Sequence, residues 1–127
     1  MTGTLAELQG VDVLLVEDES LVSFLIEDML LELGAGSVRH ANRLEGGFRL
    51  ANEKTPGLAV LDVNLGGEAI FPLAEKLTQA RVPILFITGY GRDGLSGAWA
   101  DYQVLQKPLT LAQLEGAVRA ALGARGC

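Results

Sequence analysis

Acidic residues, one threonine and one lysine follow short apolar runs at four places along this chain. If these runs are the strands of one parallel sheet, their carboxyl ends meet at the same edge and bring distant side chains together. The edge would then hold several carboxylates, one hydroxyl and one ammonium. The residues in question are Glu17-Asp18-Glu19, Asp62, Thr88 and Lys107-Pro108.

This set of groups favours the chemistry of phosphoryl acceptance. Carboxylates that share a small crevice repel one another, and a hard divalent cation relieves that repulsion. Mg²⁺ suits the site because it accepts one or two carboxylates and keeps waters that a phosphate can replace. Asp62 could attack phosphorus and become an aspartyl phosphate. The cation and Lys107 would neutralise charge on the transferred oxygens, and Thr88 could donate a hydrogen bond to one of them.

The elements that must position these residues are short apolar strands alternating with amphipathic helices. Alternation of this kind predicts an α/β fold, with a parallel sheet covered by helices on both faces. We predict strands at 11–16, 37–41, 58–61, 84–87 and 103–106. We predict helices at 20–33, 43–53, about 70–77 and 110–122.

Three of the helical segments carry further signals. The first helix should bury one apolar face, made of Val22, Leu25, Ile26, Met29, Leu30 and Leu33. In the last helix, Thr110 and Gln113 form a capping-box pattern, and Gly123 should end the helix. Segment 89–101 contains four glycines, each of which costs a helix interior about 1 kcal/mol relative to alanine. A fourth helix there should be short, frayed or mobile.

Composition narrows the class of protein. The 127 residues suit one domain, 1–127, with a core expected at about 10–123. A net charge of −6 argues against a nucleic-acid groove and a polybasic membrane surface. No apolar run is long enough to span a bilayer, and the first residues do not resemble a signal peptide. The single cysteine, Cys127, excludes an intrachain disulfide. We therefore expect a cytoplasmic protein.

The strand-end residues together resemble the receiver domain of two-component response regulators. The resemblance covers roughly residues 10–123 and implies a flavodoxin-like, five-stranded parallel sheet with strand order 2-1-3-4-5. The segments that carry it are Leu-Leu-Val-Glu-Asp-Glu (14–19), Leu-Asp-Val-Asn-Leu (61–65), Ile-Thr-Gly (87–89) and Gln-Lys-Pro-Leu (106–109).

The resemblance also implies a role for each residue of the site. It implies that Asp62 is the phosphoacceptor and that Asp18 is a direct Mg²⁺ ligand. Glu17 would be a second acid that binds the ion through a water, and the main-chain carbonyl of Asn64 would be a further ligand. Thr88 would be the switch hydroxyl, and Lys107, before a cis Pro108, would face the phosphate. The phosphoryl donor would be a histidine kinase or a histidine phosphotransfer protein. The domain would accept phosphoryl groups without acting as an enzyme on a separate substrate, and it would signal or relay through contacts with another protein.

The sequence departs from the family pattern at three points. Glu17 replaces the first of two usual aspartates. Leu65-Gly66 replaces the usual Met-Pro, which predicts a looser loop after the phosphoacceptor. Val104 occupies the position of the aromatic switch residue. Segment 86–90, Phe-Ile-Thr-Gly-Tyr, resembles a receiver subgroup with Phe-x-Thr-Gly-Tyr on its fourth strand. The candidate switch and partner surface therefore contains Tyr90, Trp99, Tyr102 and Val104.

Several alternatives stay open at this point. The chain could be a degenerate receiver that binds a partner without phosphorylation, or a receiver fragment of a larger regulator or hybrid kinase. A flavodoxin-type carrier is disfavoured because the acidic turn at 17–19 would repel a nucleotide phosphate. A dehalogenase-type phosphatase needs a second aspartate where this chain has Asn64. Trp99 and Tyr102 could belong to the core or to an exposed partner surface, and His40 is expected to be structural or to face solvent.

Overall fold

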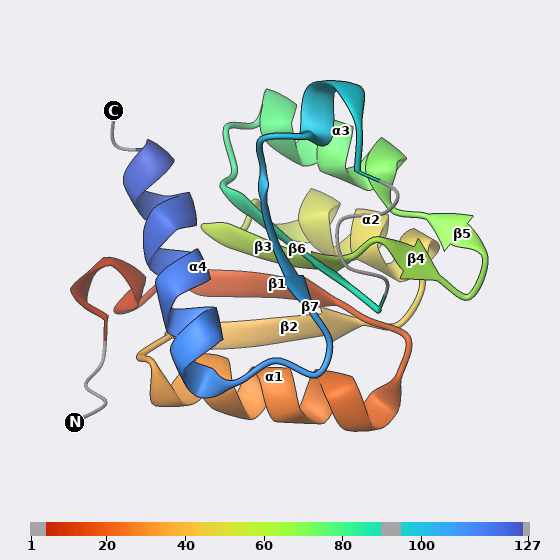
Figure 1. Ribbon diagram of the computed structural model, residues 1–127. Helices are drawn as coiled ribbons and strands as arrows, with labels where there is room; N and C mark the ends of the chain where they lie inside the picture. Colours follow the sequence, from red (N-terminus) through yellow and green to blue (C-terminus); the bar gives the residue numbers. More distant parts are fainter. Residues whose placement is uncertain (1–4, 90–94, 126–127) are drawn as a thin grey trace.

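Five parallel strands form the central sheet of the computed structural model, which describes residues 5–89 and 95–125 (Figure 1). The sheet order is β2-β1-β3-β6-β7, which confirms the predicted order 2-1-3-4-5. Every residue of the three central strands is buried, and this explains why they are near-continuous apolar runs. The strands are β1 (Asp12–Val16), β2 (Ser37–Ala41), β3 (Leu58–Asp62), β6 (Ile84–Thr88) and β7 (Gln103–Gln106).

Four α-helices cover the two faces of this sheet. Helices α1 and α4 pack on one face, and α2 and α3 on the other (Figure 1). No helix in the described ranges is both long and apolar enough to cross a membrane. The helices are α1 (Ser20–Glu32), α2 (Leu44–Glu53), α3 (Phe71–Gln79) and α4 (Leu111–Arg125).

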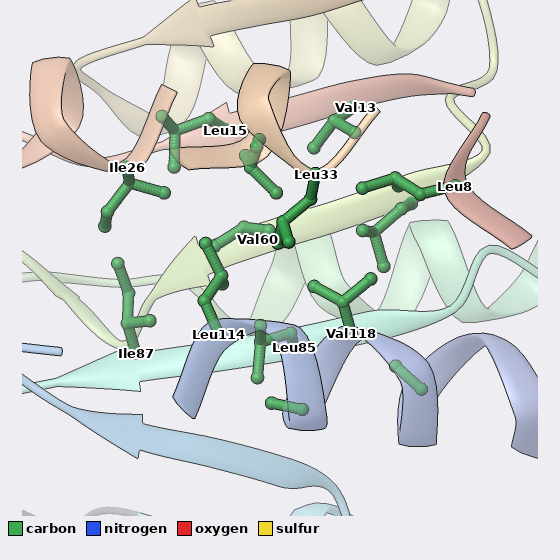
Figure 2. Close-up of a cluster of buried hydrophobic side chains, with 14 of the residues drawn as sticks. Leu8, Val13, Leu15, Ile26, Leu33, Val60, Leu85, Ile87, Leu114 and Val118 are labelled. Carbon is green, nitrogen blue, oxygen red and sulfur yellow. The ribbon is translucent and has the colours of Figure 1, made fainter. Parts of the chain in front are cut away.

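Two hydrophobic cores lie on the two sides of the sheet because strand side chains alternate in direction. Val13 and Leu15 of β1 face α1 and α4, whereas Leu14 and Val16 face α2 and α3. Figure 2 shows the first of these cores, which gathers side chains from the strands and from both helices.

The first core also includes residues that the predicted boundary left out. A 3-10 turn, η1 (Ala6–Leu8), places Leu8 among these side chains, and Leu5 is buried beside it. The N–H of Leu5 donates to the carbonyl of Leu33 at 2.7 Å. The hydrophobic core therefore includes residues before position 10, which the sequence did not indicate because two leucines separated by two residues are too short a pattern to predict an element.

The loop after β3 is ordered as a small antiparallel hairpin of β4 (Asn64–Leu65) and β5 (Glu68–Ala69). Gly66 and Gly67 have φ angles of 58° and 100°, a left-handed conformation that glycine adopts without strain. The N–H of Gly67 donates to Oδ1 of Asn64 at 2.8 Å. The prediction that Leu65-Gly66 loosens this loop is wrong, because the glycine pair forms the tight turn of the hairpin.

Helix ends differ in how well the sequence signals predicted them. The capping box is confirmed, since Gln113 N–H donates to Thr110 Oγ1 at 3.2 Å and Thr110 N–H donates to Gln113 Oε1 at 2.9 Å. Gly123 does not end α4, which continues to Arg125. One exposed glycine costs about 1 kcal/mol and is too weak to stop a helix that packing already holds.

Helix α1 buries most of the predicted stripe. Ile26, Leu30 and Leu33 are buried, and Val22 and Met29 pack against the same core. Leu25 is the exception, since it is 51% exposed, and Ser23 occupies a buried position. Apolar residues surround most of this helix, so its periodicity did not show where the buried stripe ends.

The segment between β6 and β7 is irregular where the structure describes it. Residues 95–102 form no α-helix and contain only a 3-10 turn, η2 (Gly97–Trp99). This agrees with the prediction of a short element. Residues 90–94 lie outside the described residues, so the placement of Tyr90 in the switch surface stays a prediction.

Candidate functional site

Four of the predicted site residues meet at the carboxyl edge of the sheet. Glu17 directly follows β1, Asp62 and Thr88 end β3 and β6, and Lys107 follows β7. These neighbouring parallel strands end together, so residues far apart in sequence lie around one cavity of about 310 Å³. Asp62, Thr88 and Lys107 line this cavity, as do Asp18 and Asn64.

The acids of the site differ in exposure. Glu17 is fully buried, and Asp62 and Thr88 are each 3% exposed, whereas Asp18 is exposed to solvent. One carboxylate oxygen from each of Glu17, Asp18 and Asp62 lies within 4.8 Å of the other two. The structure thus brings together the three acids that the sequence placed at the site.

The Lys107 ammonium lies between carboxylates from three directions. Its Nζ is 3.3 Å from Oδ2 of Asp62, 3.2 Å from Oε1 of Glu17 and 2.7 Å from Oε1 of Glu19. The contact with Glu19 was not predicted. The acidic run at 17–19 drew attention to this residue, but only the folded geometry shows that its side chain reaches Lys107.

Backbone groups fix the orientation of the buried acids. The N–H of Glu19 donates to Oε2 of Glu17 at 2.9 Å, and the N–H of Asn64 donates to Oδ1 of Asp62 at 3.2 Å. The His40 ring lies 2.9 Å from the main-chain oxygen of Glu17 and supports the same turn. The Lys107–Pro108 peptide bond is cis, the form that the resemblance implied.

Burial and mutual contacts shift the pKa values of the ionisable groups in this site. Desolvation raises the pKa of Glu17 from 4.5 to about 7, and the charge of Asp62 adds to the rise, while Lys107 and the Glu19 N–H oppose it. Desolvation likewise raises the pKa of Asp62, against the opposing effect of Lys107 and the Asn64 N–H. Burial alone would lower the pKa of Lys107, but its contacts with Glu19, Asp62 and Glu17 hold that pKa above its ordinary value.

These shifts indicate a site with too little positive charge for its carboxylates. Among residues 5–89 and 95–125, the Lys107 ammonium pairs with the buried acids Glu17 and Asp62 and with the exposed Glu19, and the exposed Asp18 lies beside the two buried acids. The donor set consists of oxygen atoms, which are the ligands that hard divalent cations prefer. The residues present therefore fit a Mg²⁺ ion.

Three residues of the predicted switch surface, Trp99, Tyr102 and Val104, pack against the core on the α2 and α3 side and do not line the site cavity. Trp99 and Tyr102 are half-buried and pack with Phe71 and Phe86, with ring centroids 5.2–6.0 Å apart. Val104 is half-buried on β7, beside this aromatic group. The aromatic residues thus belong to the core on the α2 and α3 side. The sequence did not predict that Phe71 and Phe86 would be their partners, because the four rings come from three separate segments: α3, β6 and residues 95–102.

Comparison with known proteins decides the family. The family model described as "Response regulator receiver domain" matches residues 13–119. The chain belongs to this family. The receiver fold and the two-component signalling context that the strand-end motifs implied are thereby confirmed.

Two curated proteins are similar to this receiver domain at about 30% sequence identity. The chain is 29% identical over 122 residues to the phyllosphere-induced regulator PhyR of Methylorubrum extorquens, covering 93% of this chain and 46% of PhyR. It is 32% identical over 115 residues to the transcriptional regulatory protein AfsQ1 of Streptomyces coelicolor, covering 86% of this chain and 50% of AfsQ1. The chain therefore spans about half the length of these curated relatives.

A solved structure agrees over nearly its whole length. The solution structure of SdrG from Sphingomonas melonis Fr1 superposes with a TM-score of 0.75 at 34% identity. The match covers 93% of this chain and 98% of SdrG.

Proposed function

We propose that this receiver domain accepts a phosphoryl group on Asp62 from a phosphohistidine of a histidine kinase or a histidine phosphotransfer protein. The observation that supports it most is the position of Asp62. Its carboxylate lines a cavity at the carboxyl edge of the sheet, 3.3 Å from an ammonium and beside two further acids. Membership of the receiver family supports a role in two-component signalling, and this geometry supports Asp62 as the residue that accepts the phosphoryl group.

The acids of the site supply the ligands for the cation. Asp18 and Asp62 would hold Mg²⁺ directly, Glu17 through a water, and the main-chain carbonyl of Asn64 would complete the protein ligands. When bound, the ion supplies positive charge that stabilises the oxygens of the transferred phosphoryl group.

Asp62 acts as the nucleophile in the proposed transfer. A carboxylate oxygen of Asp62 forms a bond to phosphorus while the phosphorus–nitrogen bond to the donor imidazole breaks, and the departing nitrogen keeps the electron pair and takes up a proton from solvent. The ammonium of Lys107 favours the ionised form of Asp62, in opposition to burial, and lies where it can stabilise the phosphoryl oxygens. The hydroxyl of Thr88, which lines the same cavity, would donate to one of them.

The surface beside the site fits a protein donor. Helix α1 begins directly after the acidic turn and exposes an apolar face, which we call the α1 face. A donor must bring its histidine close to Asp62, and the α1 face offers it adjacent apolar area to bury. The residues of the α1 face are Leu21 (71% exposed), Phe24 (74%), Leu25 (51%) and Leu31 (45%).

Phosphorylation would change the charge of the site and the contacts of Lys107. A phosphoryl group adds about −1.5 to −2 charge. Lys107 and Thr88 stand at the carboxyl ends of β7 and β6, and the aromatic group packs against Phe86 and Val104, which pair with each other in the same two strands. We propose that the output partner binds the surface formed by this segment, β7 and α4.

The test is acceptance of a phosphoryl group from a small donor. The protein is incubated with phosphoramidate and Mg²⁺, and its intact mass is measured beside that of Asp62→Asn. The expected result is a gain of one phosphoryl group by the parent chain and no gain by the variant. A parent chain that gains no mass would favour a phosphorylation-independent binding module and would overturn the proposal.

A further inference from the structure

The carboxylate closest to the site lysine belongs to a residue with no role in the proposed transfer. Glu19 lies 2.7 Å from Lys107 Nζ, whereas Asp62 and Glu17 lie at 3.3 Å and 3.2 Å. We propose that Glu19 is a positioning residue. It occupies one N–H donor of Lys107 that a phosphoryl oxygen would otherwise accept from, and so lowers the affinity of the site for a phosphoryl group. This inference rests on the proposed function.

Glu19 lines the same cavity as Asp18 and Asp62 but is not one of the acids that could hold the metal ion together. Its carboxylate is not part of the group of acids whose oxygens lie within 4.8 Å of one another. Its own N–H donates to Glu17, which fixes the turn from which the side chain extends to Lys107. The Glu19 side chain is 61% exposed, so solvent can hydrate its carboxylate when Lys107 leaves. Glu19 is thus the partner that Lys107 can release most easily.

The donors of Lys107 are fully engaged in this arrangement. A lysine ammonium has three N–H donors, and three carboxylates surround this one. A phosphoryl oxygen can therefore receive a hydrogen bond from Lys107 only if an existing partner gives way. After Lys107 has moved, the Glu19 carboxylate remains near the phosphoryl group as an uncompensated negative charge, and it repels that group.

Neutralising Glu19 should therefore strengthen binding of a phosphoryl mimic. Glu19→Gln keeps the length of the side chain and removes its charge. Because the pair is exposed, the gain in affinity should be modest, roughly two- to fivefold. Loss of a merely structural residue would not tighten binding, so the direction of the change distinguishes the two roles.

The experiment uses beryllofluoride, a non-covalent mimic of the phosphoryl group, titrated calorimetrically at saturating Mg²⁺. Glu19→Gln should bind it roughly two- to fivefold more tightly than the parent chain, and the difference should shrink at high salt. Glu19→Asp, which keeps the charge on a shorter arm, should lie between the two. The matched control is Glu68→Gln, because Glu68 lines the adjoining cavity with Asp18 but, within the described residues, forms no ion pair with Lys107. It should change the affinity by less.

Three results would overturn the role of Glu19: affinity in Glu19→Gln that is unchanged or weaker, an equal gain in Glu68→Gln, or an affinity of Glu19→Asp equal to that of Glu19→Gln. These results are distinct from failure of the proposed function. If the parent chain itself neither binds beryllofluoride nor gains phosphoryl mass, the assignment of Asp62 fails. If the parent chain does both, only the inference about Glu19 is at stake.

Discussion

An ion pair at the amino end of the sheet, opposite the candidate site, should contribute strongly to the stability of the fold. Arg39 of β2 donates to both carboxylate oxygens of Asp12 on β1, with distances of 2.7–3.2 Å. The same guanidinium donates to the carbonyls of Leu50 and Lys54 at the end of α2, at 2.6 and 2.7 Å. One side chain therefore ties two strands and a helix together.

The size of this contribution follows from burial. Asp12 is 8% exposed, so Arg39→Met would leave a nearly buried carboxylate without its cation and would remove the guanidinium donor from the carbonyls of Leu50 and Lys54. Removing one partner of a buried pair costs about 3–5 kcal/mol. Arg39 is 21% exposed, which admits some water, so we expect a loss near the lower end, about 3 kcal/mol in the free energy of unfolding.

Urea unfolding at neutral pH measures this loss. The matched control is Arg119→Met, because Arg119 is 60% exposed and, in the part of the chain that the structure describes, pairs only with Glu115 one helical turn away. An exposed pair of this kind contributes roughly 0.3–0.5 kcal/mol. A loss below about 1 kcal/mol in Arg39→Met, or a loss equal to that of the control, would refute the reasoning.

The effect should also depend on pH. Burial alone would raise the pKa of Asp12, but hydrogen bonds from Arg39 and Ser37 outweigh it and hold the pKa below 3.8. A carboxyl whose pKa is lowered by folding stabilises the native state above its unfolded pKa, and this contribution is lost as the pH falls through the folded pKa. The difference between the parent chain and Arg39→Met should therefore shrink on acidification below about pH 4.

Three further predictions concern the candidate site. Glu17→Gln removes an acid whose pKa is raised to about 7 by burial. Without Mg²⁺, the parent chain should therefore lose stability relative to the variant as the pH rises from about 4.5 to 7. Parallel curves of stability against pH would contradict the raised pKa of Glu17. Phe24→Ser should slow transfer from a cognate histidine donor but leave labelling by phosphoramidate unchanged, and equal slowing with both donors would argue against the α1 face as the docking surface. Lys107→Ala should still take up phosphoryl groups but show a smaller change in Trp99 fluorescence, and a full change would refute a switching role for Lys107.

Much of the fold was predictable because buried strands consist mostly of apolar residues, which the sequence shows directly. The strands β1, β3 and β6 are buried on both faces and therefore read as apolar runs, and their order along the chain fixed which residues stand at the carboxyl edge. The positions of Asp62 and Lys107 followed from this topology. A capping box was predictable for a similar reason, since both of its hydrogen bonds lie within four residues.

The features that were missed depend on contacts between distant residues or on weak local signals. Glu19 meets Lys107 across 88 positions, and no local pattern specifies that contact. The exposure of Leu25 was missed because apolar residues surround most of α1, so its periodicity did not show where the buried stripe ends. The Gly66-Gly67 turn was interpreted as a source of looseness, whereas two consecutive left-handed residues form a tight hairpin.

Locating the modified residue tests the central claim most directly. After incubation with phosphoramidate and Mg²⁺, borohydride reduction converts an aspartyl phosphate to homoserine, and peptide mass spectrometry then identifies the position. The account predicts homoserine at position 62 in the parent chain and none in Asp62→Asn. Homoserine at Asp18 or another acid, or its absence from every peptide, would contradict the account.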